Sequence, residues 1–139
     1  MSRFRYHNAE SFFGRVEHGA RQDRSGQLYT VGIVLQLGLS SHLLDVGFDD
    51  TWCARHLGLH VNKSLAYANA TGLDHDSPDL ERFIAILSPY GKWRNADPGH
   101  PVCDCPFSDH EVRHLTRALL ERVHQVTGHP RPRGWRQRP

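Results

Sequence analysis

The stretch that decides the fold is Gln27-Leu-Tyr-Thr-Val-Gly-Ile-Val-Leu-Gln-Leu-Gly-Leu-Ser-Ser-His-Leu-Leu-Asp-Val46, which contains the longest apolar run, residues 28–39. Large side chains alternate with smaller or polar ones from Tyr29 to Leu39, a pattern typical of a strand. Residues also recur at helical spacing, at Leu28, Val31, Leu35, Leu39, His42, Leu43 and Val46. Because no convincing partner strand follows, we expect a buried helix over 27–46. A strand over 28–39 is the alternative.

Signals for helix starts and stops predict further helices on both sides of this stretch. Ser77-Pro78 places a capping residue before a proline at the first helical position, and Ser108 with Glu111 has the spacing of a capping box. The expected helices cover about 9–21 (capped by Asn8), 50–57, 61–71, 78–88 and 109–127, besides 27–46. We therefore predict a mainly α-helical, small single-domain bundle of five or six helices. An α+β fold is the alternative if residues 28–39 form a strand.

The length of 139 residues is enough for one domain with a sizeable core. We expect a single helical domain over residues 1–127. Residues 128–139 hold four arginines, three prolines and no acid, a composition typical of a disordered basic tail. Three cysteines cannot all pair in disulfides, and no segment has the layout of a secretory signal or a membrane span. These features favour a cytoplasmic protein without a membrane partner.

Charge is distributed unevenly along the chain, although the net charge is only +2. Residues 1–39 hold five basic and three acidic side chains, residues 40–90 hold three and seven, and residues 91–139 hold nine and five. The three parts therefore carry charges of +2, −4 and +4. We expect an anionic partner to prefer the C-terminal third.

Cysteines and histidines gather in one short segment of this third. Cys103 and Cys105 lie just before the last predicted helix, and His110 and His114 lie one turn apart on its face opposite the apolar stripe. A chain reversal at Pro106 can bring the four side chains together, so we predict them to be ligands of a tetrahedral zinc ion. The C-x-C spacing is tighter than in common zinc modules. The alternatives are a plain polar helix face and a reactive thiol near the helix start.

Two basic segments of the same third contain tryptophan. The first comprises Lys92, Trp93 and Arg94, in the unpatterned loop 91–106, and the second comprises Arg131, Arg133, Trp135 and Arg136, in the tail. Such segments can stack nucleic-acid bases and hold phosphates. A solvated loop and tail are the alternative interpretation.

Residues 42–70 resemble a helix-turn-helix. Gly58 stands at the expected turn, and Ala54, four residues earlier, suits a close crossing of two helices. The resemblance implies that Asn62 and Asn69, on the exposed side of the second helix, could read adenine edges. A single lysine on that side supplies little attraction for phosphate, and the surrounding charge is −4. A plain helix pair in the core is therefore the preferred interpretation.

These observations together favour a small, non-enzymatic binding or regulatory protein that acts through its C-terminal third, namely loop 91–106, the last helix and the basic tail. We expect its partner to be nucleic acid or a protein, with zinc as a stabilising ion. The alternative is a metal-dependent enzyme that uses the Cys/His-rich surface. We favour the first reading because the carboxylates at 74–81 have no identifiable partner base.

Overall fold

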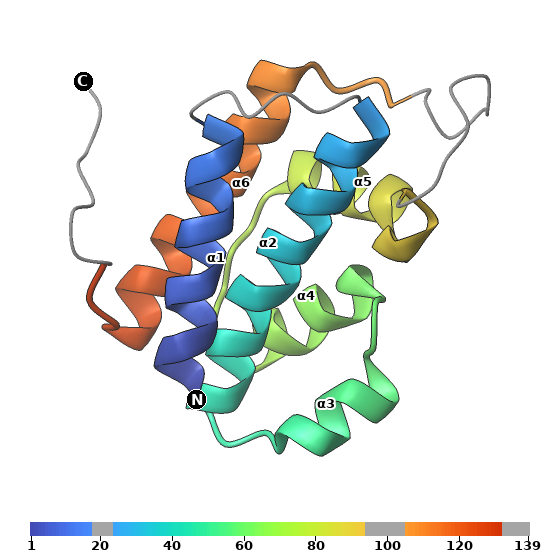
Figure 1. Ribbon diagram of the computed structural model, residues 1–139. Helices are drawn as coiled ribbons and strands as arrows, with labels where there is room; N and C mark the ends of the chain where they lie inside the picture. The colour runs from blue at the N-terminus through green and yellow to red at the C-terminus, as the bar shows by residue number, and fades with distance from the viewer. Residues whose placement is uncertain (18–23, 94–104, 132–139) are drawn as a thin grey trace.

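The computed structural model describes residues 1–17, 24–93 and 105–131. Within these ranges the chain forms six α-helices, one short 3₁₀ helix and no strand. The elements are α1 (Ser2–Glu17), α2 (Arg24–Asp45), α3 (Asp50–His56), α4 (Val61–Ala70), α5 (Pro78–Leu87), η1 (Tyr90–Trp93) and α6 (Asp109–Thr127). This arrangement, shown in Figure 1, confirms the predicted mainly α-helical bundle of five or six helices.

Helix α2 is the centre of the bundle. Its buried residues extend from Ser25 to Leu43, and it packs against α1, α4, α6 and η1. A helix buried on several sides lacks a one-sided apolar stripe, which explains why its sequence also fitted a strand. The predicted helix over 27–46 is confirmed, and the alternative strand over 28–39 is wrong. None of the described helices, α2 included, is long and apolar enough to cross a membrane.

Two glycines let neighbouring elements approach the α2 backbone closely. A Cβ atom at Gly32 would lie 2.3 Å from the Cβ of Tyr90, and one at Gly38 would lie 2.9 Å from the Cδ2 of Leu120. Both separations are shorter than a normal carbon–carbon contact. At Gly32, η1 therefore packs so close to α2 that no side chain would fit. At Gly38, α6 leaves little room for one.

Side-chain caps form at the helix starts for which the sequence contains a clear signal. Asp49 and Ser77 each accept a hydrogen bond from the backbone N–H three residues later. Ser108 and Glu111 form both hydrogen bonds of a capping box, and Gly128 ends α6 with a φ of +74°. These bonds satisfy backbone groups that helix ends otherwise leave unpaired.

Helix α1 begins earlier than the sequence predicted. We expected Asn8 to cap a helix over 9–21, but the helix begins at Ser2, and Asn8 is an exposed residue within it. Tyr6 is fully buried, so the apolar stripe starts before the predicted cap. The Ser2 hydroxyl also donates a hydrogen bond to the backbone oxygen of Ser41 at 2.6 Å. Contacts with α2 therefore determine this start.

Candidate binding surface at the junction of the chain ends

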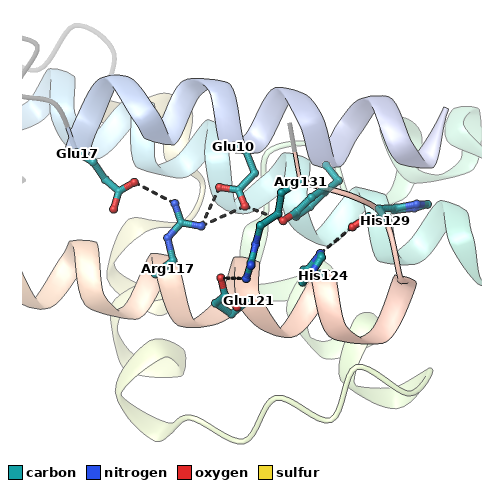
Figure 2. A network of polar contacts seen from close by, with 8 residues as sticks. Glu10, Glu17, Arg117, Glu121, His124, His129 and Arg131 are labelled. Carbon is teal, nitrogen blue, oxygen red and sulfur yellow. Dashed lines mark hydrogen bonds and ion pairs between the residues drawn. The ribbon is translucent and has the colours of Figure 1, made fainter. Parts of the chain in front are cut away.

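Helices α1 and α6 run antiparallel, and a polar network joins them (Figure 2). From α6, Nη1 of Arg117 donates to both carboxylate oxygens of Glu10, at 2.8 and 3.1 Å, and Nη2 donates to Glu17 at 2.9 Å. Only 1 % of the Glu10 side chain is exposed. A carboxylate at this depth requires a charged partner. Arg117 therefore pairs with both acidic residues of α1.

Tyr6 extends this network toward the start of α1. Its hydroxyl donates to Glu10 at 2.7 Å, and its ring stacks on His124 with the centroids 6.0 Å apart. Burial and the neighbouring Glu10 carboxylate raise the pKa of the Tyr6 phenol. The phenol therefore stays protonated and remains a hydrogen-bond donor at neutral pH.

The chain after α6 turns back beside α1, as the red end of the ribbon in Figure 1 shows, and contacts residues near the start of that helix. Nε2 of His129 lies 2.6 Å from the Ser2 hydroxyl. The backbone oxygen of His129 lies 2.7 Å from Nδ1 of His124 (Figure 2). The start of the first helix and the residues after the last helix therefore lie in contact.

Further contacts hold the residues that follow. The backbone oxygen of Pro130 accepts a hydrogen bond from Nε2 of His7 at 3.2 Å, and Arg131 forms an ion pair with Glu121. These contacts hold residues 129–131, the first part of the predicted basic tail, against the bundle. The remainder of the predicted disordered tail, 132–139, lies outside the described residues.

Ser2, His129 and Asp45 lie close together at this junction. These are the residue types of a catalytic triad, so their geometry tests whether the serine could be a nucleophile. The Ser2 hydroxyl already donates its proton to the Ser41 backbone oxygen, so the His129 nitrogen donates to Ser2 instead of accepting from it. The same nitrogen lies 3.7 Å from Asp45. In a catalytic triad the acid instead holds the other ring nitrogen. The contact thus anchors the chain after α6 and does not activate the serine.

The face of α1 that points away from the bundle is basic and aromatic. Arg3, Phe4 and Arg15 are exposed there, and the Arg15 guanidinium lies 5.2 Å from the centre of the Phe12 ring. We refer to Arg3, Phe4, His7, Asn8, Ser11, Phe12 and Arg15 as the α1 outer face. All residues of α1 are described, and its two acids both bind Arg117. The α1 outer face therefore carries positive charge without a carboxylate from its own helix.

A hollow of about 330 Å³ lies at the start of the α1 outer face. The described residues that line it are Arg3, Phe4 and His7. The Phe4 side chain is 74 % exposed, more than any other large apolar side chain among the described residues. Because His7 contacts Pro130, the hollow adjoins the chain that leads into the basic tail.

The predicted zinc ligands lie partly outside the described residues. Cys103 is in the undescribed range 94–104, whereas Cys105 packs half-buried against the core. His110 and His114 are exposed on α6, as predicted. Among the residues that the structure describes, no group of three His, Cys, Asp or Glu side chains is placed to hold a metal ion. The zinc site stays a prediction.

The two tryptophan-containing segments have different outcomes. Trp93 is 1 % exposed, and its indole N–H donates to the Leu87 backbone oxygen at 2.9 Å. This burial corrects the prediction that Trp93 stacks on a base, because the ring belongs to the core. Arg131 is tied to Glu121 and anchors the chain. The side chain of Lys92 and all of Arg94, Arg133, Trp135 and Arg136 lie outside what the structure describes.

Helices α3 and α4 favour the plain helix pair over the DNA-reading arrangement that residues 42–70 resemble. Ala54 is exposed and does not lie at a helix crossing. Asn62 accepts a hydrogen bond from a serine side chain at 2.7 Å, and Asn69 accepts one from a backbone N–H at 3.0 Å. The two asparagines that could have read bases are thus engaged within the molecule.

Sequence reasoning missed the contribution of α1 to this surface. The charge of +4 directed attention to residues 91–139 alone. One signal was present, because Arg3-Phe4-Arg5 interleaves cations with an aromatic residue in the same way as the tail does. Its position beside the tail follows only from the packing of α1 on α6.

No family model matches the chain, and no curated protein or solved structure matches it. The function is therefore inferred from the residues of the junction themselves.

Proposed function

We propose that this protein is a non-enzymatic nucleic-acid-binding protein, and that the nucleic acid binds across the α1 outer face and residues 128–139. The observation that carries the proposal is the placement of the charged side chains on α1. Arg3 and Arg15 are exposed, whereas both acids of the helix are paired with Arg117. Exposed arginines attract phosphate groups, and neither acid of α1 itself competes for these two.

The contact between the start of α1 and the residues that follow α6 supports the same proposal. The parts with net positive charge, residues 1–39 and 91–139, are joined where His7 contacts Pro130. The acidic part, residues 40–90, contributes α3, α4 and α5. A strand of nucleic acid needs a continuous positive path, and the junction brings the two basic parts of the sequence to one place.

The aromatic residues among these cations favour nucleic acid over an acidic protein partner. Phe4 and Phe12 lie on the α1 outer face, and Trp135 lies between arginines in the tail sequence. Every base offers a flat face on which an aromatic ring can stack, whereas an acidic peptide offers none. A cytoplasmic location, which the cysteine count favours, is compatible with this role.

The test is the binding of a fluorescently labelled oligonucleotide, measured by anisotropy from about 50 to about 200 mM salt. The double variant Arg3→Gln, Arg15→Gln is expected to bind more weakly. Its slope of log affinity against log salt should fall by about 0.7 for each lost contact with a single strand. Lys63→Gln is the matched control, because Lys63 is an exposed cation on α4, which α2 separates from α1 (Figure 1).

Two results would contradict the proposal. One is undetectable binding of any oligonucleotide at the lowest salt concentration. The other is an equal effect of the double variant and Lys63→Gln, which would mean that the α1 outer face holds no phosphate.

A further inference from the structure

We infer that a second surface, formed by α3, α4 and the turn before α3, binds a basic segment of a partner protein. An arginine side chain of that segment stacks on aromatic rings of this surface and pairs with a carboxylate beside them. The surface shares no residue with the proposed nucleic-acid site. We refer to its four rings as the α3–α4 aromatic cluster, which comprises Phe48, Trp52, His56 and Tyr67.

The rings of the cluster contact one another where the chain is open to solvent. The centre of the Trp52 ring lies 5.3, 4.8 and 5.5 Å from the centres of Phe48, His56 and Tyr67. Tyr67 stands at 80° to both Phe48 and Trp52, and it is 44 % exposed. An edge-to-face contact covers at most one face of a ring. The cluster therefore leaves aromatic surface for a ligand.

The packing of the bundle holds these rings in place. Trp52 and His56 are four residues apart on α3, so they lie on one face of that helix. The backbone N–H of Phe48 donates to the Leu43 oxygen at 2.9 Å, which fixes the turn before α3. Phe48 and Trp52 also pack against the hydrophobic core. Rings that are already ordered lose little conformational freedom when a ligand binds.

Asp49 supplies an exposed carboxylate beside the cluster. It lies between Phe48 and Trp52 in the sequence, and its Oδ2 accepts a hydrogen bond from the Trp52 backbone N–H at 3.0 Å. This bond caps α3 and places the carboxylate within one turn of the Trp52 ring. A cation that stacks on the cluster thus has an ion-pair partner within reach.

The neighbouring charges leave Asp49 as the carboxylate for a ligand. Asp45, Asp49 and Asp50 are the only charged residues from 45 to 54. Asp50 is paired with Arg5 at 2.7 Å, and Asp45 lies 3.7 Å from a histidine nitrogen of the junction of the chain ends.

Cations of the chain itself do not cover the cluster in the described part of the molecule. The cation–ring contacts found there are made by Arg15, Arg82 and Arg117, all with rings outside the cluster. Arg55 on α3 and Lys63 on α4 are both exposed. A cation on these rings would therefore come from a partner.

The chemistry of the surface favours arginine and a protein partner. A cation is attracted to the face of an aromatic ring, and most strongly to that of tryptophan. The planar guanidinium stacks on rings and also pairs with carboxylates, whereas the lysine ammonium is a strongly hydrated point charge. Tryptophan and tyrosine are enriched where proteins contact one another. Residues 40–90 carry a net charge of −4, which attracts a basic segment and repels the phosphates of nucleic acid.

The experiment measures the binding of a fluorescently labelled oligoarginine peptide to the full-length chain by anisotropy at one salt concentration. An oligocitrulline peptide of the same length, which has side chains of nearly the same shape without charge, should bind more weakly. Trp52→Leu keeps an apolar side chain but removes the aromatic face. It should weaken oligoarginine binding by about 2- to 30-fold, the range for one cation–π contact.

Asp49→Asn tests the carboxylate without removing the helix cap. Asparagine caps a helix as well as aspartate does, so this variant should melt close to the wild-type temperature even if Trp52→Leu is destabilised. It should weaken oligoarginine binding by about 1.5- to 5-fold, as expected for one exposed ion pair. Glu81→Gln is the matched control and should bind like the wild type. It removes an exposed carboxylate from α5, which lies in the upper half of Figure 1, whereas α3 lies at the bottom.

Three results would overturn the inference. The first is equal binding of the oligoarginine and oligocitrulline peptides, which would indicate an apolar partner. The second is wild-type affinity of Trp52→Leu, or an equal effect of Asp49→Asn and Glu81→Gln. The third is self-association of the wild type in sedimentation that Trp52→Leu abolishes, without binding of oligoarginine, because a second copy of the chain would then cover the cluster. None of these results bears on oligonucleotide binding by the α1 outer face, so the proposed function stands or falls separately.

Discussion

Arg117 holds the carboxylate of Glu10 between α1 and α6, with one guanidinium nitrogen 2.8 and 3.1 Å from the two carboxylate oxygens. The Glu10 side chain is 1 % exposed and that of Arg117 is 24 % exposed, so the pair lies inside the bundle. It has two consequences. It joins the helices whose ends form the candidate site, and it holds the Glu10 carboxylate away from the α1 outer face.

Loss of the arginine is predicted to destabilise the protein strongly. Arg117→Met leaves Glu10 buried without its charged partner, which should lower the free energy of unfolding by about 3–5 kcal/mol. The double variant Glu10→Leu, Arg117→Met should recover part of this loss, because no uncompensated charge remains. Denaturant unfolding measures both values.

Arg82→Met is the control, since Arg82 and Asp79 are 70 % and 63 % exposed. It should cost no more than about 1 kcal/mol, and a similarly small effect of Arg117→Met would contradict the prediction.

The close approach of η1 to α2 predicts opposite effects of the same substitution at two glycines. At Gly32 the added Cβ would lie 2.3 Å from the Cβ of Tyr90, so η1 must shift. Gly32→Ala should therefore destabilise the protein by about 1–3 kcal/mol despite the better helix propensity of alanine.

At Gly14, on α1, nothing lies within 4 Å of the added Cβ. Gly14→Ala should stabilise by about 0.5–1 kcal/mol. Thermal unfolding curves that shift in the same direction for both variants would contradict this reading of the packing.

The helix starts that could be predicted are those whose partners lie close together in the sequence. Ser77 and Ser108 bind backbone N–H groups three residues later, so both partners fall within one short window. The start of α1 could not be predicted in this way, because Ser2 is held by Ser41, 39 residues away. In α2 the local pattern fitted both a helix and a strand, and only burial on several sides accounts for it.

The candidate site could be predicted only in part for the same reason. The basic composition of residues 128–139 is visible in the sequence. The proximity of Arg3 and Phe4 to this segment depends on the antiparallel packing of α1 and α6. The burial of Trp93 also depends on long-range packing, so its basic neighbours in the sequence gave a misleading signal.

The predicted zinc site has a direct test. If Cys103, Cys105, His110 and His114 bind zinc, the purified protein contains one equivalent by elemental analysis, and a chelator lowers its melting temperature. The double variant Cys103→Ser, Cys105→Ser should then lose the metal and melt at the temperature of the chelated wild type. Cys53→Ser is the matched control, because Cys53 is buried in the core and should leave the zinc content unchanged. Zinc-free wild-type protein that melts like the double variant would reject the site.

Stability is predicted to fall as the pH is lowered through the titration range of histidine. Burial lowers the pKa of His42, His75 and His129; a neighbouring arginine lowers that of His75 further, and Asp45 partly opposes the shift at His42 and His129. Unfolded histidine has a pKa of about 6.5. As the pH falls below this value, the unfolded chain binds protons that the folded chain does not yet bind. The free energy of unfolding therefore decreases from about pH 6.5 downward and is insensitive to these groups above it.

Denaturant unfolding between about pH 8 and pH 5 tests this prediction, because carboxylates titrate mainly below that window. Each of the three histidines can contribute a slope of up to about 1.4 kcal/mol per pH unit. His42→Gln removes a fully buried ring whose Nε2 contacts the Thr71 hydroxyl at 3.1 Å, so it should make the pH dependence shallower, whatever its effect on stability at pH 8. Val46→Ala, at an exposed position that cannot titrate, should preserve the wild-type slope. Stability that stays constant or rises from pH 7 to pH 5 would contradict the neutral burial of these rings.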